Sequence, residues 1–212
     1  DDGILPEVLA AYLLSLGWSP PEETLFDLDE LERSGLAEAF SLERLSTSPI
    51  SFDHKKLYSM NANRIRAMKP EELGESMRPF LEKQGLSPEE LGTAYPHAVA
   101  LVRDDIRSLV DAPRQMAVFF SEIPDLERSA KELLLDKGSK EILKATLEEM
   151  EGIFSAGAGE NLSRDSFSAM IQAIAEKKKI REKSLYMPLR AALTGRTHGP
   201  PLAQIAEIIG LE

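Results

Sequence analysis

The stretch that most constrains this fold is residues 185–210, where short apolar runs are separated by proline and glycine. Pro188 suits the first position of a helix, because its missing N–H is not needed there. Gly195 suits the end of that helix, since glycine adopts a left-handed backbone at little cost. Pro201 can open a second helix, and Gly210 can end it. The sequence therefore predicts two short helices joined by a polar turn.

The rest of the chain also favours helices over sheet. Apolar residues make up 42% of the 212 residues and aromatic residues only 6%, and the apolar residues recur at helical spacing between charged ones. Further helices are expected at residues 5–16, 53–68, 71–83, 101–109, 126–135 and 141–154. The sequence predicts an all-α fold, an elongated array of two to three small helical subdomains.

Two interruptions suggest where such subdomains would meet. Lys69-Pro70 ends one helical pattern, because a residue before proline is disfavoured in a helix. A second interruption falls near Gly138. We expect subdomains at residues 1–68, 69–137 and 138–212.

Charge gives a mixed indication of the partner. The formal net charge of −11 argues against nucleic acid, but residues 140–212 hold ten basic and ten acidic side chains. Basic side chains cluster in residues 53–69 and 176–198. A phosphate contact depends on the potential within about 8 Å in physiological salt, so both clusters could bind nucleic acid. The alternative, that these residues only keep helix surfaces solvated, stays open.

Side chains suited to catalysis or metal binding are sparse. The chain has no cysteine, which excludes disulfides and thiolate metal sites. Its histidines, His54, His97 and His198, lack metal-ligand spacing. Phosphate-binding loops and nucleophile turns are absent. No apolar run reaches the length of about 18 residues that suggests a membrane span. We expect no catalytic residue, metal site or membrane segment here.

Two segments resemble a known family. Residues 187–202, MPLRAALTGRTHGPPL, resemble the C-terminal anticodon-binding region of bacterial-type glutamyl-tRNA synthetases. Residues 5–21 and 48–66 are similar to the family's helical region that contacts the inner corner of tRNA. Ser59 stands where the family usually has Trp, and Asp105 where it often has a basic residue.

The resemblance implies the tRNA-binding portion of a class I glutamate–tRNA ligase, which joins glutamate to tRNA using ATP. The family's ATP-binding signatures are absent, so ATP and Mg²⁺ are expected in an N-terminal catalytic domain outside this chain. The expected partners are tRNA specific for glutamate and that catalytic domain, and binding of tRNA for glutamine stays open. The resemblance further suggests a cytoplasmic monomer.

Site residues follow from the resemblance and from charge. Arg190 matches a family arginine near the anticodon, and Gly199, Pro200 and Leu202 match a turn against its first base. Leu202 could equally belong to the core. Further anticodon candidates are Arg196, Arg103 and Arg107. Candidates for the tRNA backbone are Lys177, Lys178, Lys179, Arg181, Lys55, Lys56, Asn61 and Arg64.

Two other classes of function are weighed against this one. A helical adaptor could bind proteins through residues 20–48, which hold eight acidic and two basic side chains. Such binding would not depend on tRNA or on residues 177–183. A complete small enzyme would turn over glutamate and ATP, and the missing nucleotide-binding motifs argue against it.

Overall fold

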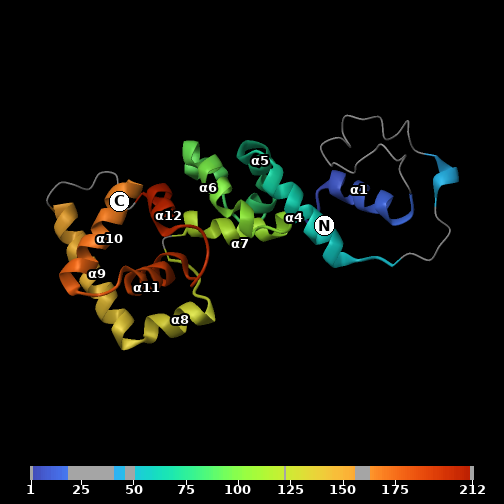
Figure 1. Ribbon diagram of the computed structural model, residues 1–212. Coiled ribbons are helices and arrows are strands. Elements are labelled where there is room, and N and C mark those ends of the chain that lie inside the picture. The colour runs from blue at the N-terminus through green and yellow to red at the C-terminus, as the bar shows by residue number, and fades with distance from the viewer. Residues whose placement is uncertain (1, 19–40, 46–50, 122, 156–162, 211–212) are drawn as a thin grey trace.

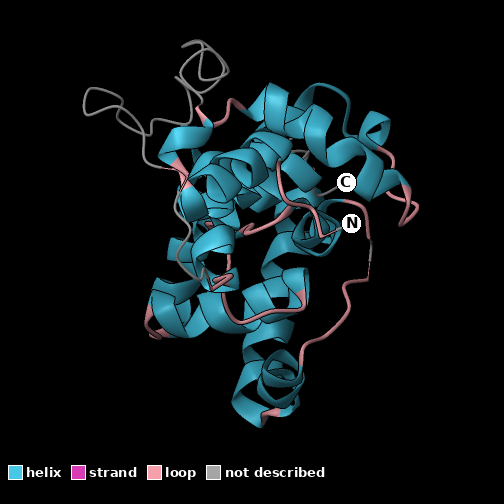
Figure 2. Ribbon diagram, turned by 90° about the vertical axis from the view of Figure 1, so that its right-hand side faces the viewer, coloured by secondary structure: helices cyan, strands magenta, loops and turns pink. Residues whose placement is uncertain are grey.

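The computed structural model describes residues 2–18, 41–45, 51–121, 123–155 and 163–210. Within these ranges the regular structure consists of ten α-helices and short 3₁₀-helices, and it contains no strand (Figure 2). One isolated β-bridge joins Trp18 to Leu45. The predicted all-α fold is confirmed.

The α-helices are α1 (Pro6–Gly17), α4 (His54–Ala67), α5 (Pro70–Glu82), α6 (Tyr95–Val102), α7 (Ala112–Met116), α8 (Arg128–Leu135), α9 (Lys137–Ser155), α10 (Arg164–Lys178), α11 (Glu182–Thr194) and α12 (Leu202–Ile209). The 3₁₀-helices are η1 (Leu42–Arg44), η2 (Pro88–Ala94), η3 (Arg103–Asp105), η4 (Leu109–Asp111) and η5 (Ala117–Phe119).

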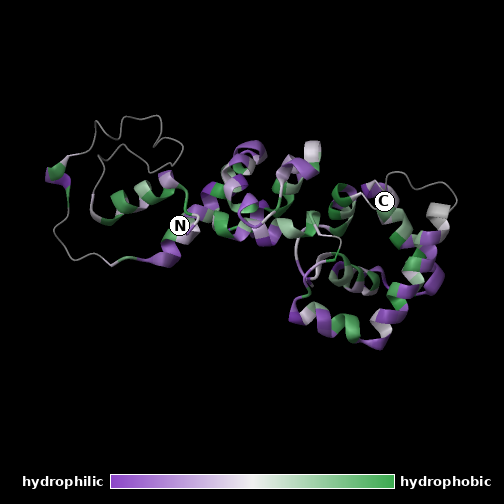
Figure 3. Ribbon diagram, turned by 180° about the vertical axis from the view of Figure 1, so that it is seen from behind, coloured by the Kyte–Doolittle hydropathy of each residue, from purple (hydrophilic) through white to green (hydrophobic). Residues whose placement is uncertain are grey.

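The helices form an elongated molecule with α1 at one end and α9 at the other (Figure 1). We call residues 2–121 the first unit, residues 123–127 the linker, and residues 128–210 the second unit. The first unit encloses an apolar core built mainly from α1, α4, α5, α6 and α7. The second encloses a smaller core built mainly from α10, α11 and α12. Hydrophobic and hydrophilic residues alternate along the helices, as expected for helices that bury one face (Figure 3).

The last described helix, α12, belongs to both cores. Leu202 and Ala206 are buried in the core of the second unit. Ile205 is buried in the core of the first unit, and Ile208 and Ile209 pack against it. In Figure 1, α12 lies between α10 and α6, and it contacts both. One short helix therefore fastens the two units together through apolar contacts on two faces.

Contacts of two other helices bear on the expected subdomains. Helix α4 packs on α1 and shares the first core with α5, α6 and α7. Helix α8 contacts α9 and α11. The expected boundaries at residues 68 and 137 stay predictions.

Helix α11 begins earlier than the sequence predicts. It starts at Glu182, so Pro188 lies inside the helix and the predicted start at Pro188 is wrong. Leu185 is fully buried and Pro188 and Leu189 are buried with it, so burial of this face extends the helix by almost two turns. This burial outweighs the hydrogen bond that proline removes.

Helix α6 ends earlier than predicted. The apolar pattern suggested a helix over residues 101–109, but α6 ends at Val102. The Asp111 carboxylate accepts hydrogen bonds from the N–H groups of Arg107 and Ser108, each at 3.0 Å. The N–H of Leu109 donates to the carbonyl oxygen of Gly3 at 2.9 Å. These partners replace the bonds that a continuing helix would form.

Candidate nucleic-acid interface

The polar turn predicted after α11 spans residues 195–201, and its own side chains and backbone fix its shape. Gly195 has a φ of +71° and ends α11, as predicted. The Thr194 hydroxyl donates to the carbonyl oxygen of Arg190 at 2.7 Å and accepts from the N–H of Arg196 at 3.2 Å. His198 and Gly199 are exposed at the tip. The turn is thus anchored at its start and open at its tip.

Arg190 holds the other end of the turn. Its Nη1 donates to the carbonyl oxygen of Pro200 at 2.7 Å, and the side chain is only partly exposed. Burial lowers the pKa of the Arg190 guanidinium, although arginine stays charged in proteins. The structure therefore places Arg190, Gly199 and Pro200 together, with the arginine bracing the turn from within. Leu202 is 2% exposed and lies in the second core, the alternative that the sequence left open.

The linker runs unusually close to the beginning of the turn. A Cβ added to Gly195 would lie 2.1 Å from the carbonyl oxygen of Asp125. The N–H of Glu127 donates to the carbonyl oxygen of Gly195 at 2.8 Å. Because no side chain fits at this contact, residue 195 has to be glycine for two separate reasons, conformation and space.

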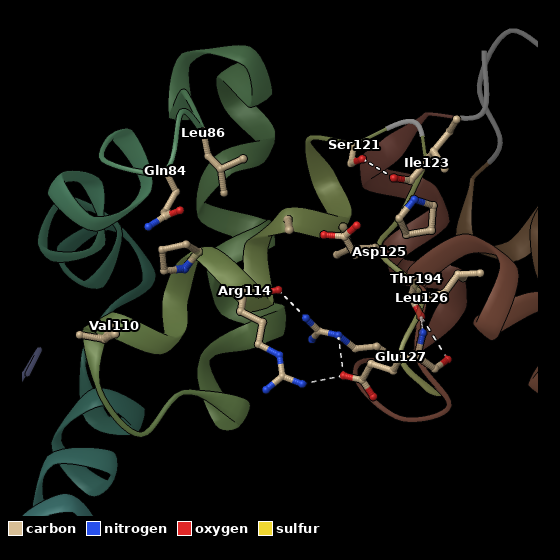
Figure 4. Close-up of a pocket in the computed structure, with 15 residues that line it drawn as sticks. Gln84, Leu86, Val110, Arg114, Ser121, Ile123, Asp125, Leu126, Glu127 and Thr194 are labelled. Carbon is tan, nitrogen blue, oxygen red and sulfur yellow. Dashed lines mark hydrogen bonds and ion pairs between the residues drawn. The ribbon is translucent and has the colours of Figure 1, made fainter. Parts of the chain in front are cut away.

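Arg196 points inward, away from the exposed tip of the turn. Its guanidinium donates to the side-chain oxygen of Gln115 and to the carbonyl oxygen of Arg114, both in α7. Its Nε lies 3.5 Å from the carboxylate of Glu127, which also accepts from Arg114 at 2.7 Å. Figure 4 shows Arg114 and Glu127 facing each other across this contact. Burial, followed by the positive charge of Arg114, lowers the pKa of Arg196.

A cleft of about 640 Å³ lies beside this cluster, between the first unit and the linker (Figure 4). Its lining combines exposed apolar side chains with the charged pair described above. The main lining residues are Val110, Pro113, Arg114, Ile123, Leu126 and Arg196.

The basic cluster between α10 and α11 lies on the surface. Lys178, Lys179 and Arg181 are exposed, and Lys179 ends α10 in a left-handed conformation with a φ of +54°. Lys177 is also exposed and forms an ion pair with Glu149 of α9. Three of these four predicted backbone contacts therefore present basic groups to solvent, and the fourth shares its charge with a carboxylate.

The basic residues of α4 divide into two groups. Lys55 and Lys56 are exposed at its first turn, where the Lys56 ammonium lies 6.0 Å from the centre of the Tyr12 ring. Arg64 is largely buried and forms ion pairs with Glu7 and Glu72 at 3.3 and 3.7 Å. Lys55 and Lys56 can reach a polyanion, whereas Arg64 ties α4 to its neighbours.

Asn61 lies inside the protein, which corrects its expected place on an RNA-binding surface. Its side chain is fully buried. The amide oxygen accepts from the N–H of Leu5 at 2.9 Å, and Nδ2 donates to the carbonyl oxygens of Arg107 at 2.8 Å and Gly3 at 3.4 Å. The Asn61 amide thus links Gly3 and Leu5 to Arg107, just before η4, through hydrogen bonds.

Two of the further anticodon candidates, Arg103 and Arg107, lie in the first unit. Arg103 is partly buried, and its Nη1 donates to the carbonyl oxygen of Met68 at 3.2 Å. Arg107 is exposed. Neither belongs to the cluster around the 195–201 turn.

Sequence reasoning did not single out Glu127 or Gln115, although both hold Arg196. Gln115 lies 81 residues before Arg196, so no local spacing links the two.

Among the described residues, no group of three or more His, Cys, Asp or Glu side chains could hold a metal ion. Nor does any helix in those ranges have the length and apolar character needed to cross a membrane.

Comparison with known proteins identifies related sequences. Residues 59–212 match the family model described as anticodon binding domain. The "Glutamate--tRNA ligase" of Desulfitobacterium hafniense is 33% identical over 219 residues, covering 99% of this chain and 42% of that protein. The protein of the same name from Desulforamulus reducens is 34% identical over 216 residues, with the same coverage. The chain spans about two fifths of the length of these relatives.

A solved structure shares the fold. It is a glutamate tRNA ligase from Elizabethkingia meningosepticum in complex with its amino acid, with a TM-score of 0.73 at 21% sequence identity. The match covers 98% of this chain and 39% of that one. At this identity the likeness shows a common helical architecture.

Proposed function

Because this chain belongs to the anticodon binding domain family, we propose that it is the tRNA-binding portion of a glutamate–tRNA ligase. In this proposal the chain binds and orients tRNA specific for glutamate. ATP and Mg²⁺ would bind a catalytic domain outside residues 1–212, which would also be a partner of this chain. We further propose that the protein acts as a monomer in the cytoplasm.

The observation that carries the proposal is the anchored turn at residues 195–201, which lies inside the matched family region. Arg190 and Thr194 hold its two ends, while His198 and Gly199 stay exposed. Single-stranded RNA loops present unstacked base edges that protein groups can recognise. A turn that is fixed before binding loses less entropy on binding than a mobile one does. The geometry therefore suits recognition of bases in a loop.

Charge at the end of α11 opposite to the turn supports the same function. Lys178, Lys179 and Arg181 are exposed between α10 and α11, and α11 is the helix that leads into the turn. Basic side chains that neutralise phosphates release counterions, which gives affinity without sequence preference. We assign base recognition to the turn and phosphate binding to this cluster. The acidic surface proposed for an adaptor lies mostly outside the described residues.

The test is a fluorescence-anisotropy titration of this chain with tRNA specific for glutamate and with the same tRNA carrying a swapped anticodon. We expect the cognate tRNA to bind at least about tenfold more tightly, the effect of one or two lost base contacts. Affinity should fall as salt rises, with a logarithmic slope of about −2 to −3 for three phosphate contacts. Equal affinity for both tRNAs would contradict anticodon recognition, and no binding to either would contradict tRNA binding by this chain.

A variant then tests the turn itself. Arg190→Ala removes the donor that braces Pro200, so cognate affinity should fall by about 1–3 kcal/mol while the swapped-anticodon tRNA is affected less. The matched control is Arg128→Ala, which removes the same charge from a side chain that is 94% exposed on α8. If Arg190→Ala binds like the control, Arg190 does not belong to the site.

A further inference from the structure

Besides the linker, two features of the described residues join the first unit to the second. One is α12, whose apolar side chains enter both cores. The other is the polar cluster around Arg196, which we call the latch: Arg114, Gln115, Glu127 and Arg196. Apolar attraction is not directional, so the contacts of α12 hold the units together without strongly selecting one orientation. A second, polar attachment with directed hydrogen bonds would select one relative orientation of the two units.

Arg196 has the geometry of such an attachment. Its side chain is only 18% exposed, although it belongs to a surface turn. The planar guanidinium donates to two oxygens of α7 in the first unit and faces Glu127 at the end of the linker. Its guanidinium contacts oxygens of this protein on two segments that are remote from the turn in sequence, α7 and the linker. The residue is thus already engaged before any ligand arrives.

We propose that Arg196 is a positioning residue that fixes the second unit on the first, and that RNA affinity depends on it through this geometry and not through a phosphate contact. The proposal rests on the proposed function, since the anchored turn lies in the second unit and Arg103 and Arg107 lie in the first. An RNA loop that touches both units binds tightly only when their relative orientation matches it.

Replacing Glu127 tests the proposal, because positioning and electrostatics predict opposite changes in RNA affinity. Removing a carboxylate from an RNA-binding surface should strengthen binding, because it lowers repulsion of phosphates. Glu127 accepts from both Arg114 and Arg196, however, so its removal also loosens the latch. Positioning predicts weaker binding of RNA by Glu127→Gln, whereas electrostatics alone predicts equal or tighter binding.

The binding experiment uses the full chain and the cognate tRNA over a salt series. Glu127→Gln and Arg196→Gln should each weaken binding about tenfold, and the double variant should be little weaker than either. Arg196→Lys should weaken binding almost as much as Arg196→Gln, because lysine keeps the charge but not the planar fork of donors. Arg128→Gln is the charge-matched control, since it breaks the exposed pair with Glu132, and it should bind within about twofold of the unaltered chain.

A spectroscopic distance tests the geometry without RNA. Because the chain has no cysteine, spin labels can be placed at two engineered sites alone. Ala67→Cys on α4 and Ala173→Cys on α10 label exposed positions in different units. Ala67→Cys with Ala100→Cys labels two exposed positions of the first unit as the control. Adding Arg196→Gln should broaden or shift the distance distribution between units and leave the control pair unchanged.

Either of two binding results would overturn the proposal: Glu127→Gln binding at least as tightly as the unaltered chain, or Arg196→Gln reducing the salt slope by about one phosphate contact. An unchanged distribution between units in Arg196→Gln would also overturn it. If the unaltered chain binds no tRNA, the proposed function fails. The positioning role then depends on the spin-label distances alone, and an unchanged distribution again refutes it.

Discussion

Replacing Gly195 by alanine tests the contact between the linker and the anchored turn. Gly195 has a φ of +71°, and an added Cβ would lie 2.1 Å from the carbonyl oxygen of Asp125. Real Cβ atoms essentially never approach another heavy atom within 3.0 Å, so the backbone would have to move by about 1 Å. Such a movement would also stretch the hydrogen bond from Glu127 to Gly195, which is 2.8 Å long.

The expected loss of unfolding free energy in Gly195→Ala has two parts. A left-handed backbone costs a non-glycine residue about 1 kcal/mol. Forcing a methyl group into an occupied space costs about 1–3 kcal/mol through backbone shifts. We therefore expect Gly195→Ala to lower the free energy of unfolding by about 3 kcal/mol.

Gly85→Ala is the matched control, and urea unfolding followed by circular dichroism is the assay. Gly85 has a φ of +76°, but nothing lies within 4 Å of its added Cβ. The control should therefore show only the conformational part, about 1 kcal/mol. A difference of less than about 0.5 kcal/mol between the two variants would refute the close contact between residue 195 and the linker.

Three further predictions concern the first unit. Asn61→Ala should lower the free energy of unfolding by about 2–3 kcal/mol because it leaves buried backbone groups without partners, whereas exposed Asn63→Ala should change it by less than about 0.5 kcal/mol in the same urea assay. Asp53→Ala should cost about 1 kcal/mol, since the carboxylate caps α4 by accepting from two N–H groups, and an unchanged urea midpoint would contradict this. Burial raises the pKa of Tyr95 from 10.0 to about 12, so its stabilising effect is complete below pH 10 and is lost as pH rises through about 12. A spectrophotometric titration should lose its component near pH 12 in Tyr95→Phe, and loss of a component near pH 10 would show that the phenol is not buried.

Local signals predicted the elements of this fold well where tertiary contacts agree with them. The helices predicted at residues 5–16 and 53–68 form as α1 and α4, with Pro6 at the first position of α1 and Asp53 capping α4, and Gly195 ends α11 as predicted. In each case the deciding interaction lies within a few residues of the signal. Pro188 differs, because burial of Leu185 in the second core decides where α11 begins. The strength of that burial depends on helices far away in the sequence.

The site was harder to predict for the same reason. Asn61 bonds to groups 46, 56 and 58 residues away, and no local rule indicates that its amide is buried. Arg196 stands in a polar turn, so charge and exposure suggested a ligand contact. Its guanidinium instead donates hydrogen bonds to Gln115 and Arg114 in α7 and is largely buried. The basic residues Lys178, Lys179 and Arg181 between α10 and α11 are exposed, and their contact with the tRNA backbone stays a prediction.

Because α12 contributes to both cores, its late synthesis affects when each unit can fold. A ribosome releases α12 after every other described helix, yet α12 supplies apolar side chains to the core around α6 as well as to the core around α10. Until residue 209 has emerged, the nascent first unit exposes the apolar surface that Ile205 later covers. Neither unit can therefore complete its core before α12 has been released. A chain stalled before residue 202 would expose an apolar surface on each unit, and chaperones would have to cover both surfaces.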